Sequence, residues 1–244
     1  MIGTAAAKLE ILADADALAR RVADWLLAGA LAKPGVFAVA LSGGATPRLL
    51  YGHLAKPPYR DAFPWGRAHW FWGDERFVPP DDSQSNYRMV RAALLSQAPI
   101  PEANIHPIPT TGMSPEAAAS AYERELQSFY GSRHLDPARP LFDVVLLGLG
   151  PDGHTASLFP GASVLAERGK WAAAVADAKG ETRITLTYPA LESSRNAAFL
   201  VTGEEKRAIL ERFRSGDDGL PAARLRPTGA LWLFADAAAA GAWQ

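Results

Sequence analysis

The sequence predicts an α/β protein in which a mostly parallel, Rossmann-like sheet has helices on both faces. Short continuous apolar runs such as Val36–Leu41 and Leu141–Leu147 are typical of parallel strands that are buried on both sides. These runs alternate with segments whose apolar residues recur at helical spacing, as in Asp14–Ala30. Strands that alternate with helices favour a parallel sheet covered on both faces.

Local signals mark where the helices begin. Asp14–Ala30 repeats apolar residues every four positions, which predicts an amphipathic helix. Pro47 suits a first helical position and predicts a helix that starts there. Ser114 before Pro115 combines a capping residue with a first-position proline, and the helix is expected to reach Tyr130. The other predicted helices are Tyr87–Gln97, Pro189–Ser193, Glu204–Arg214 and a closing helix at Ala237–Ala240.

The remaining apolar runs complete the expected sheet. They are Ala68–Gly73, Trp171–Ala176, Arg183–Thr187, Ala197–Thr202 and Ala230–Phe234. Between them, Val78–Asn86 is too polar for the core and too long for a tight turn, which is typical of a binding loop or a lid. The chain has neither an internal repeat nor a low-complexity linker, so we expect residues 1–244 to form a single domain.

Composition excludes several classes of function. The 25 basic and 26 acidic residues give a formal net charge of −1, so no basic field favours nucleic acid or an anionic membrane. Cysteine is absent, which excludes disulfides, thiolate nucleophiles and cysteine-bound metals. No apolar run approaches the roughly 18 residues of a membrane helix, and the start lacks a signal-peptide pattern. We expect a cytoplasmic monomer or small homo-oligomer.

Four polar clusters follow predicted strands or their glycine-rich turns. They are Ser42–Thr46, Asp74–Arg76, Asp152–His154 and Gly203–Lys206. Because ligands of open α/β sheets bind beyond the carboxyl ends of the strands, these clusters are the candidate site. Their common position carries more weight than any one motif.

The first cluster has the composition of an anion-binding turn. Gly43 and Gly44 let backbone N–H groups approach a ligand, Ser42 and Thr46 add hydroxyl donors, and a helix N-terminus follows. Its spacing matches neither the Walker loop nor the dinucleotide fingerprint. A tight strand-to-helix turn with no ligand is the alternative.

His154 is the candidate general base. An unperturbed imidazole titrates near pH 6.5, which suits proton transfer at neutral pH, and Asp152 or Asp74 can orient the ring. A histidine that only caps a following helix is the alternative. No histidine pair has recognisable metal-ligand spacing, so no metal is implied.

Two cations complete the candidate site. Arg76 can bind an anionic or carbonyl oxygen, although a surface ion pair explains it equally well. Lys206 stands in a first helical turn, where a cation opposes the helix dipole, and this suggests another task. A solvated lysine is the alternative.

Taken together, these segments resemble the 6-phosphogluconolactonase family. The resemblance covers about residues 36–210, and its most specific part is the Asp-Gly-His-Thr-Ala-Ser-Leu-Phe-Pro stretch that begins at Asp152. That motif lies within the matching stretch Leu147–Gly161, and the other matching stretches, in order, are Leu41–Arg48, Phe71–Pro79, Ser85–Met89, Arg183–Thr187 and Val201–Arg207.

The resemblance implies hydrolysis of 6-phospho-D-glucono-1,5-lactone in the oxidative pentose phosphate pathway, without an organic cofactor. It also implies a fold similar to that of glucosamine-6-phosphate isomerase. In that superfamily the loop equivalent to Ser42–Thr46, with Arg183 and Lys206, holds the sugar phosphate, and His154 is the base. Asn86 and Gly153 lie in matching stretches and are expected to bind substrate, with backbone N–H groups near Gly153 or the Arg76 side chain stabilising the oxyanion.

Two alternatives remain open. The isomerase (deaminase) of the same superfamily has a glutamate immediately before the proline of this motif, whereas Phe159 stands before Pro160 here and cannot exchange protons. A non-catalytic sugar-phosphate sensor would keep the phosphate loop, but such a module usually carries a DNA-binding region, and no basic helix-turn-helix segment is apparent.

Overall fold

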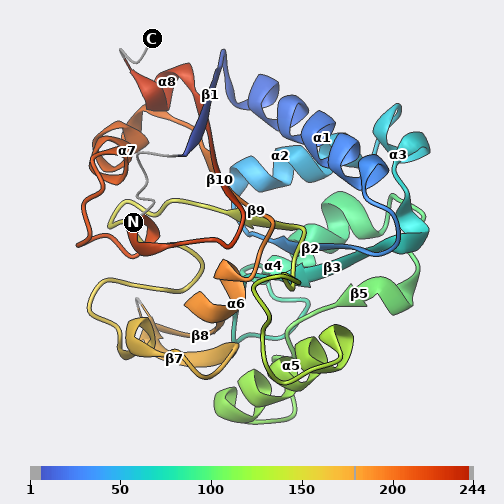
Figure 1. The fold of residues 1–244 in the computed structure, drawn as a ribbon, viewed down its shortest axis with the longest axis vertical. Coiled ribbons are helices and arrows are strands. Elements are labelled where there is room, and N and C mark those ends of the chain that lie inside the picture. Colours follow the sequence, from blue (N-terminus) through green and yellow to red (C-terminus); the bar gives the residue numbers. More distant parts are fainter. Residues whose placement is uncertain (1–6, 179, 242–244) are drawn as a thin grey trace.

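The computed structural model describes residues 7–178 and 180–241, and within them the strands form two sheets (Figure 1). The larger sheet has seven strands in the order β1-β10-β9-β6-β2-β3-β5, and all of its strand pairs are parallel. Its strands are β1 (Lys8–Leu12), β2 (Phe37–Leu41), β3 (Ala68–Trp72), β5 (Ile105–His106), β6 (Val144–Leu147), β9 (Asn196–Val201) and β10 (Ala230–Asp236). The mostly parallel sheet predicted from the sequence is confirmed.

The smaller sheet is antiparallel and has three strands in the order β4-β8-β7. Its strands are β4 (Asp74–Arg76), β7 (Ala172–Ala178) and β8 (Glu181–Leu186). Strands β7 and β8 lie at the lower left of Figure 1, and the three strands form a sheet separate from the main one. The strands predicted at 171–176 and 183–187 therefore exist, but they do not join the main sheet: β8 pairs with β4 on one side and with β7 on the other.

Helices lie on both sides of the main sheet (Figure 1). In that view α1 and α2 lie above the sheet and α5 lies below it. The helices are α1 (Ala15–Ala32), α2 (Ala45–Leu54), α3 (Tyr59–Ala62), α4 (Asn86–Val90), α5 (Pro115–Tyr130), α6 (Tyr188–Glu192), α7 (Arg207–Arg214) and α8 (Ala237–Ala240).

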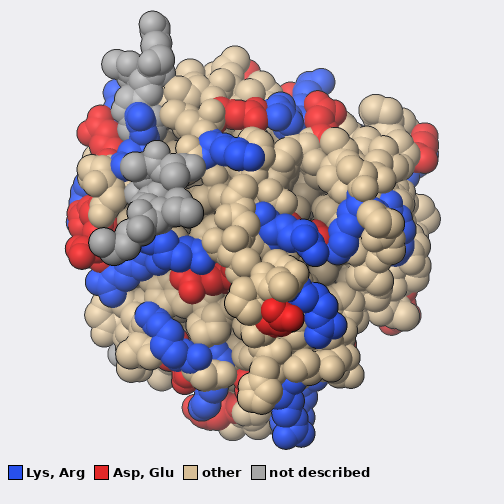
Figure 2. All heavy atoms as spheres, in the orientation of Figure 1, with Lys and Arg blue, Asp and Glu red and all other residues tan. Residues whose placement is uncertain are grey.

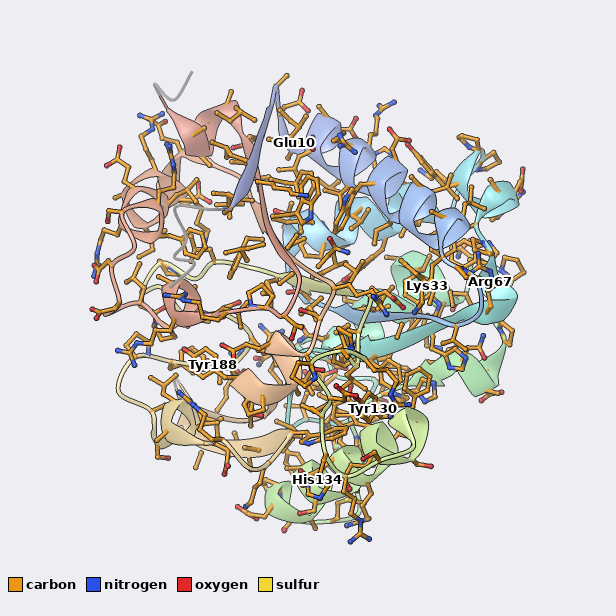
Figure 3. All side chains as sticks on the ribbon, viewed as in Figure 1. Glu10, Lys33, Arg67, Tyr130, His134 and Tyr188 are labelled. Carbon is orange, nitrogen blue, oxygen red and sulfur yellow. The ribbon has the colours of Figure 1, made fainter. Side chains whose placement is uncertain are left out.

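Helix α1 illustrates how local sequence produces these elements. The Asp14 carboxylate caps the helix by accepting from the Ala17 N–H at 2.8 Å. The four-residue apolar repeat forms one buried face, since Leu18 and Val22 are fully inaccessible to solvent. At the other end Arg67 donates to the carbonyl oxygens of Lys33 (2.7 Å) and Gly35 (2.8 Å), and Figure 3 shows Lys33 and Arg67 close together there. A cation at a helix C-terminus is favourable because that end carries partial negative charge.

Several predicted boundaries differ from the structure. Helix α2 begins at Ala45 with Gly44 as its N-cap, so Pro47 is its third residue instead of its first. The predicted helix 87–97 begins at Asn86 and continues past Val90 as a π-helical segment, Arg91–Leu95. The strand predicted from Leu141 starts at Val144, and β8 begins at Glu181, two residues before Arg183.

Three strands were not predicted. β1 and β5 lie at the two edges of the main sheet, and β4 is only three residues long. β1 and β5 lack the continuous apolar run of a central strand because edge strands are partly open to solvent, whereas β4 is buried at Asp74 and Glu75 but contains no apolar residue. None of the helices in the described part of the chain is long and apolar enough to cross a bilayer. Figure 2 shows basic and acidic side chains interspersed over the visible face.

Candidate active site

A cleft of about 340 Å³ lies beyond the carboxyl ends of β2, β6 and β9. The four polar clusters predicted from the sequence all contribute to it, because parallel strands bring their carboxyl ends to one edge of the sheet. The predicted site residues that line it are Ser42, Gly43, Gly44, Thr46, Asp74, Arg76, Asn86, His154, Arg183 and Lys206. Asp152 and Gly153 do not line it.

The loop between β2 and α2 is held by a buried tyrosine. The Ser42 N–H donates to the Tyr51 hydroxyl at 3.0 Å, and that hydroxyl donates to the Ser42 carbonyl at 2.8 Å. Burial raises the pKa of Tyr51, so the phenol stays neutral and keeps both bonds. The Thr46 hydroxyl pairs with that of Thr202 at 2.6 Å, which ties the loop to the end of β9. The loop is therefore fixed on both sides of the helix start.

His154 is held by contacts on several sides. Its Nδ1 is hydrogen-bonded to Asp152 Oδ1, and its ring centroid lies 4.5 Å from that of Phe159. The backbone of Gly150 lies beneath the imidazole, and a Cβ there would fall 2.0 Å from His154 Nδ1. A larger residue than glycine at 150 would displace the ring. The structure thus assigns the contact with His154 to Asp152, one of the two carboxylates that the sequence left open.

Asp74 has other partners. Its Oδ2 accepts from the Ser157 hydroxyl at 2.6 Å and lies 3.9 Å from Arg183 Nη1. The Arg183 guanidinium also donates to Glu181 at 2.9 Å and lies over the Phe159 ring, 5.6 Å from its centroid. Asp74 therefore places a carboxylate in the cleft beside a cation, and it does not orient the imidazole.

Gly153 does not line the cleft, and its backbone donor is engaged within the turn. Its N–H donates to the Gly150 carbonyl at 2.9 Å, and the His154 N–H points to Asp152 Oδ1 at 3.2 Å. Both backbone donors are engaged inside the turn, so neither is directed at a ligand. Gly153 is required for a different reason: it has a positive φ of 81°, and a Cβ would fall 2.6 Å from Leu220.

Arg76 and Asn86 form one connected pair. Arg76 Nη1 donates to Asn86 Oδ1 at 3.0 Å and to the Gln84 carbonyl at 2.8 Å. Asn86 Nδ2 donates to the Asp74 carbonyl at 2.9 Å. The Asn86 amide also lies against Gly43, where an added Cβ would fall 2.0 Å from Oδ1. Residues from the second sheet, the polar loop and the β2–α2 loop therefore meet at one point.

Lys206 reaches the cleft from a short 3₁₀ turn, Glu204–Lys206, that follows β9. Its Nζ donates to the Leu149 carbonyl at 2.8 Å. An ammonium group has three donors, so this bond leaves capacity for a ligand. Lys206, which the sequence places unfavourably in a first helical turn, thus lines the cleft as a cation.

Thr202 and Ser157 were not singled out from the sequence, and Glu205 was named only as part of the Gly203–Lys206 cluster. Thr202 and Glu205 line the cleft, and the Ser157 hydroxyl binds Asp74. Thr202 and Glu205 adjoin the end of β9, where the position after a strand is the only available signal. Within residues 7–178 and 180–241, no cluster of three or more His, Asp or Glu side chains has an arrangement suited to a metal ion.

A parallel sheet with a cleft at its carboxyl edge, lined by a histidine whose ring contacts a carboxylate, is typical of an α/β enzyme. The family described as glucosamine-6-phosphate isomerases/6-phosphogluconolactonase matches residues 13–233. The chain therefore belongs to this family.

Relatives place the chain on the lactonase side of the family. A 6-phosphogluconolactonase of Nostoc sp. is 41% identical over 238 residues, which cover 95% of this chain and 96% of that protein. The crystal structure of 6-phosphogluconolactonase from Thermotoga maritima has a TM-score of 0.80 at 32% identity, covering 94% of this chain and 99% of the other. The resemblance to lactonases inferred from the sequence motifs is confirmed.

The similarity to the isomerase fold is also confirmed. A monomeric glucosamine-6-phosphate deaminase has a TM-score of 0.80 and covers 96% of this chain and 98% of its own. Its sequence identity is 18%, so the likeness concerns the fold alone.

Proposed function

We propose that this chain hydrolyses 6-phospho-D-glucono-1,5-lactone to 6-phospho-D-gluconate, a step of the oxidative pentose phosphate pathway. The observation that carries the proposal is a histidine–carboxylate pair, His154 and Asp152, beside a cleft that Arg183 and Lys206 also line. Relatives that share most of the chain are named 6-phosphogluconolactonase, which supports the same reaction.

The histidine activates the attacking water. With Nδ1–H donating to Asp152, the basic lone pair of the His154 imidazole is on Nε2. Nε2 takes a proton from water as the water oxygen forms a bond to C1 of the lactone. The tetrahedral intermediate then collapses, the bond from C1 to the ring oxygen breaks, and His154 returns the proton to that oxygen. The products are a free hydroxyl group and a carboxylic acid that ionises in water.

Charge that develops on the carbonyl oxygen needs a donor. The N–H groups of Gly153 and His154 are engaged within their own turn, so Arg76 is the better candidate of the two that the sequence left open. A guanidinium held by Asn86 and the Gln84 carbonyl is already oriented before the reaction, so it costs no reorganisation in the transition state.

We assign the phosphate group to the Ser42–Thr46 loop together with Arg183 and Lys206. The Ser42–Thr46 loop leads into the N-terminus of the ten-residue helix α2, where partial positive charge favours an anion. Arg183 and Lys206 line the same cleft and supply full charges. A phosphate held there orients the lactone carbonyl toward His154, and binding energy remote from C1 is used for positioning.

The deaminase reaction is the weaker alternative. The glutamate that precedes the proline in deaminases is replaced by Phe159, whose ring packs against His154 and under Arg183. A phenyl ring cannot relay protons. We also propose that residues 1–244 act as one domain, because apolar residues of both sheets, such as Val39 and Ile184, belong to one core cluster. We place the protein in the cytoplasm, since a chain without cysteine is compatible with a reducing compartment.

The test measures release of 6-phosphogluconate from freshly prepared lactone at neutral pH, corrected for spontaneous hydrolysis. His154→Ala is expected to lower kcat by about 10²- to 10⁴-fold, the usual contribution of a positioned general base. His134→Ala is the matched control, since His134 is an exposed histidine away from the cleft and should leave kcat unchanged (Figure 3). Wild-type turnover in His154→Ala would overturn the assignment of the base. Binding of the phosphosugar without turnover by the unmodified chain would indicate a sensor module.

A further inference from the structure

The Glu75 carboxylate is buried beneath the cleft and accepts four hydrogen bonds. Its side chain belongs to β4, and the residue is only 2% exposed. Oε1 accepts from the backbone N–H groups of Arg76 (2.8 Å) and Asn86 (2.7 Å). Oε2 accepts from the Tyr87 N–H (2.7 Å) and the Ser85 hydroxyl (3.2 Å). Three of these four donors belong to consecutive residues at the start of α4.

The contacts form a complete cap for α4. The first N–H groups of a helix have no partner within the helix, and a carboxylate placed there also meets the positive end of the helix dipole. Glu75 accepts from the first two residues of α4, while the Ser85 side chain accepts from the Arg88 N–H at 3.1 Å. Glu75 thus joins β4 to a helix eleven residues further along the chain.

Burial of the Glu75 carboxylate carries a desolvation cost. Among residues 7–178 and 180–241, no cation forms an ion pair with it, and burial raises the pKa of its carboxyl group. A buried carboxylate that is stabilised only by hydrogen bonds is destabilised when any of those bonds is lost. The apolar residues common in β-strands would avoid this cost, so the glutamate points to a task beyond packing.

That task is visible in the two residues that it fixes. Asn86, whose N–H binds Glu75, places its side chain between Arg76 Nη1 and the Asp74 carbonyl and against Gly43. Arg76 follows Glu75 directly, and its own N–H binds the same oxygen. One carboxylate therefore sets the backbone position of both residues, and through Asn86 it supports the β2–α2 loop.

We propose that Glu75 is a positioning residue for lactone hydrolysis, which orients Arg76 and Asn86 by capping α4. Glu75 does not line the cleft and does not touch substrate. The proposal rests on the function proposed above, because it assumes that Arg76 and Asn86 act on the lactone.

Glu75→Gln is the decisive variant. A glutamine keeps the shape of the side chain, but its amide nitrogen would face an N–H donor where the carboxylate had an acceptor, so at least one bond is lost. We expect kcat/KM to fall by about 10- to 100-fold, mainly through kcat, because misplacement of about 1 Å has effects of this size. Glu192→Gln is the control: Glu192 is half-buried, accepts the Arg226 N–H at 2.9 Å and does not line the cleft.

A double-mutant cycle separates positioning from general stability. In an Asn86→Ala background, Glu75→Gln should lower kcat/KM by less than about 3-fold, because residues that act through one another are not additive. All variants are assayed well below their unfolding midpoints, which thermal denaturation supplies. If Glu75→Gln does not fold, Glu75→Asp takes its place in the cycle, since the shorter side chain keeps the charge but cannot reach all four donors.

The outcomes are distinct. Loss of kcat/KM in the Glu75 variant that largely disappears in the Asn86→Ala background supports the proposal. Wild-type kcat/KM in the Glu75 variant, while Asn86→Ala is impaired, overturns it and leaves the proposed function intact. Full additivity of the two substitutions also overturns it. Failure of the unmodified chain to accelerate lactone hydrolysis would refute the proposed function itself, and the positioning role with it.

Discussion

Substitution of Gly43 by alanine tests how the cleft is assembled. The added methyl carbon would fall 2.0 Å from Asn86 Oδ1 and 2.6 Å from Asn86 Cγ, so the Asn86 side chain must move. Movement breaks its bonds to the Asp74 carbonyl (2.9 Å) and from Arg76 Nη1 (3.0 Å). A buried neutral hydrogen bond contributes about 1 kcal/mol net, and the partly exposed one to Arg76 about as much. We therefore expect a loss of about 2 kcal/mol.

Two assays measure this change. For a chain of this size, 1 kcal/mol corresponds to about 2–4 °C in Tm, so Gly43→Ala should lower Tm by about 4–8 °C. It should also lower kcat/KM by about 10- to 100-fold, because Asn86 and Arg76 lose their positions. Thermal denaturation and the lactone assay are run on the same preparation.

Gly52→Ala provides the comparison. Gly52 lies within α2, and no heavy atom lies within 4 Å of a Cβ added there. Alanine is favoured over glycine in a helix by about 1 kcal/mol, so this variant should raise Tm slightly and leave kinetics unchanged. If Gly43→Ala matched Gly52→Ala in both Tm and kcat/KM, the account of the contact between Gly43 and Asn86 would be wrong.

Two further predictions concern a residue assigned to phosphate binding and the dependence of stability on pH. Lys206→Ala should raise KM for the lactone by about 10-fold or more, since one charged contact to phosphate is lost, and unchanged KM and kcat would exclude the phosphate role. Burial and the neighbouring His106, whose Nε2 lies 2.9 Å from His69 Nδ1, lower the pKa of His69. Below about pH 6.5 the unfolded chain therefore binds a proton that the folded chain does not, and stability falls as pH decreases from 7 toward 5. His69→Gln should reduce the slope of Tm against pH in that window, whereas His134→Gln should have a smaller effect; equal slopes in wild type and His69→Gln would refute the argument.

Much of the fold was predictable because its signals are local. Helix α1 follows from the four-residue apolar repeat and the Asp14 cap, and α5 from Ser114 and Pro115. The central strands are continuous apolar runs because both of their faces are buried. β4 escaped prediction because Asp74–Arg76 contains no apolar residue, and its strand conformation depends on pairing with β8, more than 100 residues away.

Part of the candidate site was predictable and part was not. The polar clusters after β2, β6 and β9 meet because parallel strands end at one edge of a sheet, and this rule needs only the predicted strands. Which carboxylate contacts His154 was not predictable, because Asp74 and Asp152 both follow strands and differ only in where their loops fold back.

The layers of this protein, the edge of the sheet that bears the site and the polar residues that meet there all follow from the order of residues along the chain. Periodicity, capping and strand-end position are properties of neighbouring residues, so they can be read along the chain. Three contacts follow only from packing: Asp152 binds His154, the Gly153 N–H donates to the Gly150 carbonyl, and Glu75 caps α4. Such contacts depend on hydrogen-bond geometry of a few tenths of an ångström, often between distant segments, and only the packed chain fixes that geometry.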